Sequence, residues 1–122
     1  MSQKHRAELK ALFQKPCTNV IGFHQLLDHP EPEKFSQVKR MQYRAYMVGS
    51  GLKVAEMILR YDDVFIELFP QKREQIACLT RQADEIQRMA VMLDGESTAR
   101  WGNRLCRFAG DCIAIFDGET DR

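Results

Sequence analysis

The sequence STARWGNRLCRFAGDCIAIFD, residues 97–117, is typical of a helix that other helices enclose. At 100° per residue its polar side chains fall on a stripe about 100° wide. That stripe contains Arg100, Asn103, Arg104, Arg107 and Asp111. The rest of the circumference is apolar and carries Trp101, Leu105, Phe108, Ile113 and Phe116. Because such a helix belongs inside a bundle, we predict an all-α fold in which this last helix is largely buried.

The segment that precedes it predicts a helix that packs along one seam. Apolar residues recur there at alternating intervals of three and four, at Ile76, Leu79, Ala83, Ile86, Ala90 and Leu93. This spacing is typical of helices that pack side by side. Gly95 can end the helix in the left-handed conformation, and Ser97 can cap the next one. We therefore expect these two helices to be antiparallel neighbours.

Residues 52–69 form a second segment with an excess of apolar surface. Its polar residues are confined to a stripe about 80° wide. The apolar remainder includes Leu52, Ile58, Phe65 and Phe69. Asp62 lies outside the polar stripe, so either it is a buried acid or the helix breaks near Tyr61 and Asp62 caps a second short helix; we favour the break. A short strand over 64–69 is the third alternative, since β-branched and aromatic residues favour strands.

Three further breaks divide the first half of the chain. Pro16 should end a helix, because the residue before a proline is disfavoured in the helical conformation. His29-Pro30-Glu31-Pro32 should be a loop, and Gly49-Ser50-Gly51 is the strongest break in the middle of the chain. The chain is then a single domain, 1–122, built as a compact bundle of five to six helices with antiparallel neighbours. The predicted helices are residues 2–15, 18–28, 32–48, 52–69, 70–93 and 97–117.

The helix predicted at 32–48 is amphipathic. Its apolar face carries Phe35, Val38, Met41, Ala45 and Tyr46. The opposite face carries Lys39, Arg40, Tyr43 and Arg44. A tyrosine among basic residues is able to stack on a nucleic-acid base, and the arginines of the last helix, Arg100, Arg104 and Arg107, form a second row suited to phosphate groups.

Charge is unevenly distributed along a chain whose formal net charge is only +1. Residues 1–46 carry eight Lys or Arg against four Asp or Glu, whereas the short tail 117–122 is acidic. No apolar run is long enough to cross a bilayer, and the first residues lack the apolar segment of a secretory signal. The four cysteines form no Cys-x-x-Cys pair. We therefore expect a cytoplasmic protein with reduced thiols.

The sequence contains no constellation of residues that predicts catalysis. It has neither a nucleophile elbow nor a glycine loop for phosphate. Cys17, His24 and His29 are the only cluster of zinc-ligand types, and His24 and His29, five positions apart, do not share a helix face. We therefore predict a protein that is not an enzyme, with no metal, no cofactor and no small-molecule substrate.

Two functional hypotheses follow from these patterns. The first is a non-enzymatic interaction protein, a subunit, adaptor or inhibitor that binds a protein partner or a second copy of itself through the apolar excess of residues 52–69 and 97–117. The second is a small helical subunit or regulator that binds nucleic acid through its basic helix faces. By size and helical character alone, the chain is similar to small helical subunits of nucleic-acid-guided effector complexes and to phage-encoded inhibitors of them.

Overall fold

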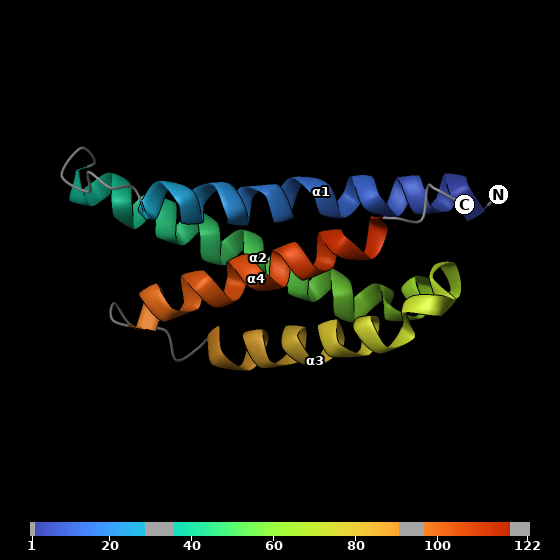
Figure 1. The fold of residues 1–122 in the computed structure, drawn as a ribbon. Coiled ribbons are helices and arrows are strands. Elements are labelled where there is room, and N and C mark those ends of the chain that lie inside the picture. Colours follow the sequence, from blue (N-terminus) through green and yellow to red (C-terminus); the bar gives the residue numbers. More distant parts are fainter. Residues whose placement is uncertain (1, 29–35, 91–96, 118–122) are drawn as a thin grey trace.

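The structure is a computed structural model that describes residues 2–28, 36–90 and 97–117. Within these residues four α-helices run up, down, up and down, so that chain neighbours are antiparallel (Figure 1). They are α1 (Ser2–Leu27), α2 (Gln37–Leu68), α3 (Arg73–Ala90) and α4 (Ser97–Phe116). The all-α class and the antiparallel arrangement are confirmed. The predicted number of five to six helices is wrong, because two of the expected breaks do not occur.

Pro16 does not end a helix, since it lies inside α1, which is 26 residues long. A proline inside a helix removes one hydrogen bond and costs about 3 kcal/mol. The cost is offset by packing, because Phe13, Cys17 and Val20 lie on one face of α1 and are fully buried.

Gly49-Ser50-Gly51 is not a turn, since it lies in the middle of α2. Gly51 is buried, and a Cβ atom placed on it would lie 2.7 Å from Leu105 Cδ2 of α4. This glycine therefore allows α4 to approach α2 closely. Met47 and Val54, on either side, are also buried and hold both halves of the helix against the core.

The break predicted near Tyr61 is confirmed as a kink within α2. Tyr61 has non-helical backbone angles, φ −112° and ψ 18°, and the helix resumes to Leu68. Asp62 is half-buried, and its Oδ1 accepts a hydrogen bond of 2.8 Å from the Asp63 backbone N–H. Residues 64–68 are therefore helical and not a strand. A 3₁₀ turn, η2 (Pro70–Lys72), then leads into α3.

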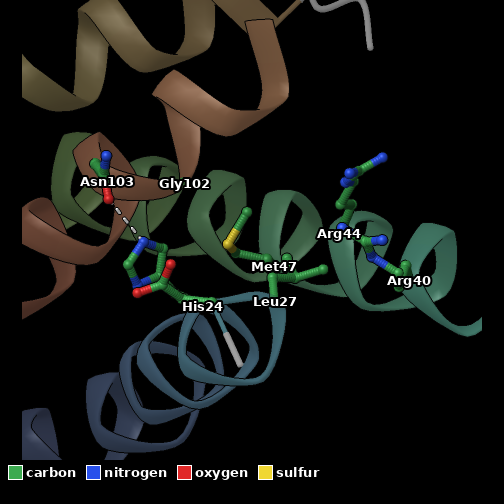
Figure 2. A pocket seen from close by; sticks show the side chains of 8 residues that line it. His24, Leu27, Arg40, Arg44, Met47, Gly102 and Asn103 are labelled. Carbon is green, nitrogen blue, oxygen red and sulfur yellow. Dashed lines mark hydrogen bonds between the residues drawn. The ribbon is translucent and has the colours of Figure 1, made fainter. Parts of the chain in front are cut away.

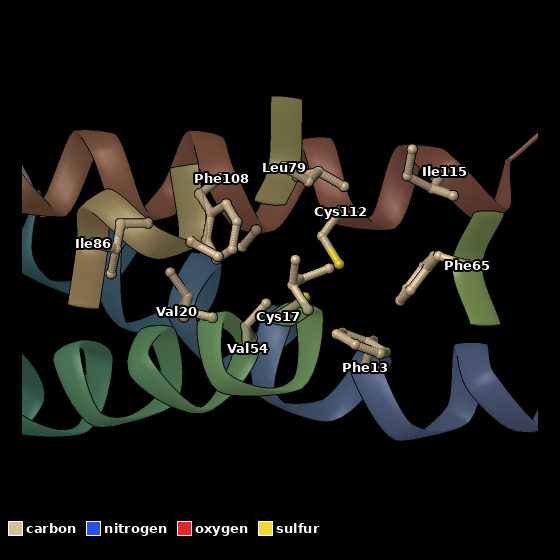
Figure 3. Packing of buried hydrophobic residues seen from close by; sticks show 14 of the residues in the cluster. Phe13, Cys17, Val20, Val54, Phe65, Leu79, Ile86, Phe108, Cys112 and Ile115 are labelled. Atoms are coloured by element: carbon tan, nitrogen blue, oxygen red, sulfur yellow. The ribbon is translucent and has the colours of Figure 1, made fainter. Parts of the chain in front are cut away.

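The core lies between all four helices, and α4 contributes most of one side of it (Figure 3). As predicted, α4 is largely buried; Trp101, Leu105, Phe108 and Phe116 are each no more than 5% exposed. Four phenylalanines pack together at one end of the bundle, with ring centroids 5.1–6.3 Å apart. They are Phe13, Phe65, Phe69 and Phe116. Each contributes roughly 1.5–3 kcal/mol through burial.

Two basic side chains cap helix C-termini near the four phenylalanines. Arg6 donates from Nε and Nη2 to the Leu68 carbonyl at 3.0 and 2.8 Å, and its guanidinium lies 5.1 Å from the Phe69 ring centroid. Lys72 Nζ donates to the Ala114, Ile115 and Asp117 carbonyls at 3.2, 2.7 and 2.7 Å. Both satisfy carbonyls that a helix C-terminus leaves without intrahelical donors.

Candidate functional site

The apolar residues predicted as core or interface are inside the bundle. Leu52 and Ile113 are half-buried, and the other seven are buried. Those seven are Ile58, Phe65, Phe69, Trp101, Leu105, Phe108 and Phe116. Helices of the same chain cover them, so these nine residues of the ranges 52–69 and 97–117 are used mainly in the core.

The three most exposed large apolar side chains of the described residues lie on the first half of α2. Val38, Met41 and Tyr46 are 65%, 60% and 56% exposed. Ala45 is exposed beside them, and Phe35 of the same predicted face lies outside the described residues. We call Val38, Met41, Ala45 and Tyr46 the outer face of α2. An amphipathic helix normally turns its apolar face to the core, so this orientation is the reverse of the usual one.

The continuity of α2 explains this reversal. Its buried face runs through Met47, Gly51, Val54 and Ile58. Extended back by one and two helical turns, the same face reaches Arg44 and Arg40, which are half-buried. Because no turn at 49–51 uncouples the two halves, the core contacts of the second half fix the orientation of the first.

Aromatic contacts with α1 hold the first half of α2 in this orientation. The Phe23 ring lies 5.7 Å from the Tyr43 ring and 5.4 Å from the Tyr46 ring, centroid to centroid. Tyr43 is half-buried, so part of its ring is used in this contact. Tyr46 keeps more than half of its surface in water while its ring is held in place.

A pocket of about 280 Å³ opens on the inner side of the same segment, where α1, α2 and α4 converge (Figure 2). It is lined by His24, Leu27, Asp28, Arg40, Arg44, Met47, Gly102 and Asn103. His24 and Asn103 lie on one side and the two arginines on the other, with Leu27 and Met47 between them. The pocket thus combines a polar wall, a cationic wall and an apolar floor.

Hydrogen bonding and a glycine shape the polar wall. His24 Nε2 lies 2.9 Å from Asn103 Oδ1, and because an amide oxygen only accepts, the ring nitrogen donates. The Asn103 amide NH₂ group keeps its own donors. A Cβ atom on Gly102 would lie 3.1 Å from His24 Cδ2, so glycine allows α4 to lie close to the imidazole.

The cationic wall has no internal counter-ion among the residues that the structure describes. Arg40 and Arg44, one turn apart on α2, form no hydrogen bond or ion pair within 2–28, 36–90 and 97–117. Asp28 is exposed at the rim. Lys39, the third cation of the predicted basic face, is also exposed, and its backbone N–H is capped by Ser36 Oγ at 3.2 Å.

Arg104 and Arg107 of the second predicted basic row do not line this pocket. Arg104 Nη2 is paired with Glu85 of α3 at 2.5 Å, and Nη1 lies 3.4 Å from Met89 Sδ. Arg107 is exposed. The side chain of Arg100 lies outside the described residues, as do the predicted loop 29–32, Leu93, the Gly95 cap and the tail 118–122.

The candidate metal ligands are separated by the fold. Cys17 is fully buried in the core beside Cys112, whereas His24 lines the pocket and His29 lies outside the described residues. Within the described ranges no three His, Cys, Asp or Glu side chains are placed to hold a metal ion together. A hydrogen bond with Cys17, together with burial, raises the pKa of Cys112. Burial alone raises the pKa of Cys106.

Sequence reasoning missed this pocket because its lining comes from three helices. In the sequence His24 fits only a metal-ligand cluster and Asn103 only a polar stripe. No pattern within one helix signals that such residues meet, and a basic helix face by itself predicts exposure to solvent or to a partner.

Comparisons with protein-family models, curated proteins and solved structures find no match. None of the helices in the described part of the chain combines the length and apolar character needed to span a bilayer.

Proposed function

We propose that this chain is a non-enzymatic interaction protein that binds a partner protein through the outer face of α2. The supporting observation is the exposure of Val38, Met41 and Tyr46 on one side of a helix whose other side is packed. With Ala45, these residues follow the i, i+3, i+7, i+8 spacing by which one helix lies along another. Methionine and tyrosine are enriched in interface cores.

The charge around this face selects the kind of partner. Lys39 is exposed on this segment and residues 37–50 contain no Asp or Glu, whereas Arg40 and Arg44 turn towards the pocket on the inner side. A second copy bound through the same face would bring like charges together, whereas an amphipathic helix with acidic flanks would complement them. The partner we propose is therefore a different protein that presents an acidic amphipathic helix.

The Phe23 contact prepares the face for binding. Tyr46 is already held at 5.4 Å from the Phe23 ring, so little side-chain freedom remains to be lost when a partner covers it. Tyr46 and Met41 are accordingly the residues expected to contribute most to the affinity.

The test is a photo-cross-linking amino acid placed at Met41, with Leu12 on α1 as the matched position because it is 53% exposed. The peptide cross-linked in host cells should be acidic and amphipathic, and a synthetic copy should bind the purified chain in calorimetry. Met41→Glu combined with Tyr46→Glu should weaken that binding by at least about tenfold, while Leu12→Glu should leave it unchanged. Cross-links to a second copy of the chain, or equal affinities for both variants, would overturn the proposal.

A second candidate is binding of nucleic acid through Lys39, Arg40 and Arg44, favoured by the absence of acids from residues 37–50. The pairing of Arg104 with Glu85 works against an extended phosphate-binding surface. Anisotropy of labelled single and double strands at low salt tests it, because phosphate contacts make binding strongly salt-dependent. Lys39→Glu with Arg40→Glu should abolish any binding if this candidate holds.

A further inference from the structure

The pocket between α1, α2 and α4 carries two arginines that form no ion pair within the described part of the chain. Arg40 and Arg44 place two guanidinium groups on one wall, and only Asp28, exposed at the rim, carries a negative charge among the lining residues. A guanidinium is always charged, and it binds best to an oxyanion that accepts two parallel hydrogen bonds.

We infer that this pocket binds the phosphate group of a small phosphate monoester. A phosphate monoester offers three terminal oxygens and close to two negative charges, which matches two guanidinium forks on consecutive turns of one helix. A single carboxylate, with one charge and two oxygens, satisfies only one fork. Asn103 lines the opposite wall, where its amide oxygen accepts from His24 Nε2.

The apolar floor and the size of the pocket fit the carbon part of such a molecule. Leu27 and Met47 lie between the two polar walls (Figure 2). A volume of about 280 Å³ is close to the ~300 Å³ at which ligand pockets begin, so it suits a phosphate with a short apolar or aromatic group.

The inference does not depend on the proposed partner protein. The pocket lies on the inner side of α2, whereas the outer face carries Met41 and Tyr46 on the other side of the same helix. Met41→Glu with Tyr46→Glu should therefore leave phosphate binding intact, so that the failure of one proposal is distinguishable from the failure of the other.

Titration of the isotope-labelled protein with phenyl phosphate, followed by amide NMR, tests the inference. Saturable shifts are expected at Met47, Gly102 and Asn103, and inorganic phosphate should bind more weakly because it lacks the carbon part. Arg40→Gln with Arg44→Gln should weaken binding by at least about tenfold. Arg107→Gln, at an exposed arginine outside the pocket, should change it less than about twofold.

Asp28→Asn is a variant that should change the affinity for phenyl phosphate in the opposite direction. Removing the rim carboxylate should strengthen phenyl phosphate binding severalfold, because like charge then no longer opposes the ligand. Circular dichroism should show that all variants are folded. Three results would overturn the inference: no saturation by about 10 mM, equal affinities for the double arginine variant and Arg107→Gln, or binding only of a 5′-phosphorylated oligonucleotide or a phosphopeptide.

Discussion

Alanine at Gly49 should stabilise the protein, whereas alanine at Gly51 should not, although the two positions are two residues apart in α2. A Cβ atom at Gly51 would lie 2.7 Å from Leu105 Cδ2 and 3.3 Å from Cδ1. A Cβ atom at Gly49 would meet nothing within 4 Å. The pair therefore separates the backbone effect of alanine from the effect of close packing between α2 and α4.

The magnitudes follow from two competing contributions. Replacing glycine by alanine inside a helix gains about 1 kcal/mol, so Gly49→Ala should raise the free energy of unfolding by roughly that amount. At Gly51 the same gain is opposed by overpacking, which costs about 1–3 kcal/mol. Leu105 is fully buried and both its methyl groups are close, so rotating the side chain exchanges one close contact for the other. The two variants should differ by about 1–3 kcal/mol.

Urea unfolding followed by far-UV circular dichroism measures both variants at constant protein concentration. A Leu105→Ala background provides the control, because it removes the atoms that the new Cβ would meet. In that background Gly51→Ala should become stabilising, and the double-mutant cycle should give a coupling energy of about 1 kcal/mol or more.

Two results would refute the reasoning. Equal stabilisation by both alanines would mean that α4 does not approach α2 closely at Gly51. Destabilisation by Gly49→Ala would mean that residues 49–51 form the turn that the sequence predicts, in which case the orientation of the first half of α2 would no longer follow from that of the second.

Three further predictions concern the thiols and a helix end. A thiol reagent should modify the exposed Cys78 in the folded protein, whereas Cys17 and Cys112 should react only as the chain unfolds; peptide mass spectrometry that finds all three modified together would contradict this. Because contact with Cys17 and burial raise the pKa of Cys112, its thiolate forms first in the unfolded chain. The free energy of unfolding should therefore fall as pH rises above about 8.5, by up to about 1.4 kcal/mol per pH unit. If the free energy of unfolding of a Cys112→Ala variant falls equally steeply with pH, the pKa of Cys112 is not raised. Lys72→Met should lower the free energy of unfolding by about 1 kcal/mol, because it removes the donor to the last carbonyls of α4. Lys53→Met, at an exposed position of α2, should leave the free energy of unfolding nearly unchanged. Equal urea midpoints for the two variants would exclude the capping role of Lys72.

Several elements were predictable because their signals are local. The seam of α3 is confirmed, since Ile76, Leu79, Ala83 and Ile86 are all buried. The start of α4 at Ser97 and the kink at Tyr61 also agree with expectation. Periodicity and capping act over one or two turns, so a single sequence contains enough information to place them.

The helix breaks were harder to predict, because proline and glycine can either end a helix or lie within one. Pro16 lies within α1 because burial of Phe13 and Cys17 offsets the lost hydrogen bond. Glycine at position 51 has a low helix propensity, but its lack of a side chain allows Leu105 to approach the backbone of α2. In both cases the deciding contact comes from another helix, and composition within the segment does not reveal it.

The sequence by itself determined that this protein is helical and that α4 lies inside it, and it favoured a break near Tyr61 over two alternatives. Only the tertiary structure decided which way the first half of α2 faces. Since α2 is continuous, the burial of Met47, Gly51 and Val54 fixes its rotation. That rotation turns Arg40 and Arg44 towards a pocket and leaves the outer face in water, the reverse of what the amphipathic pattern of that half alone implies.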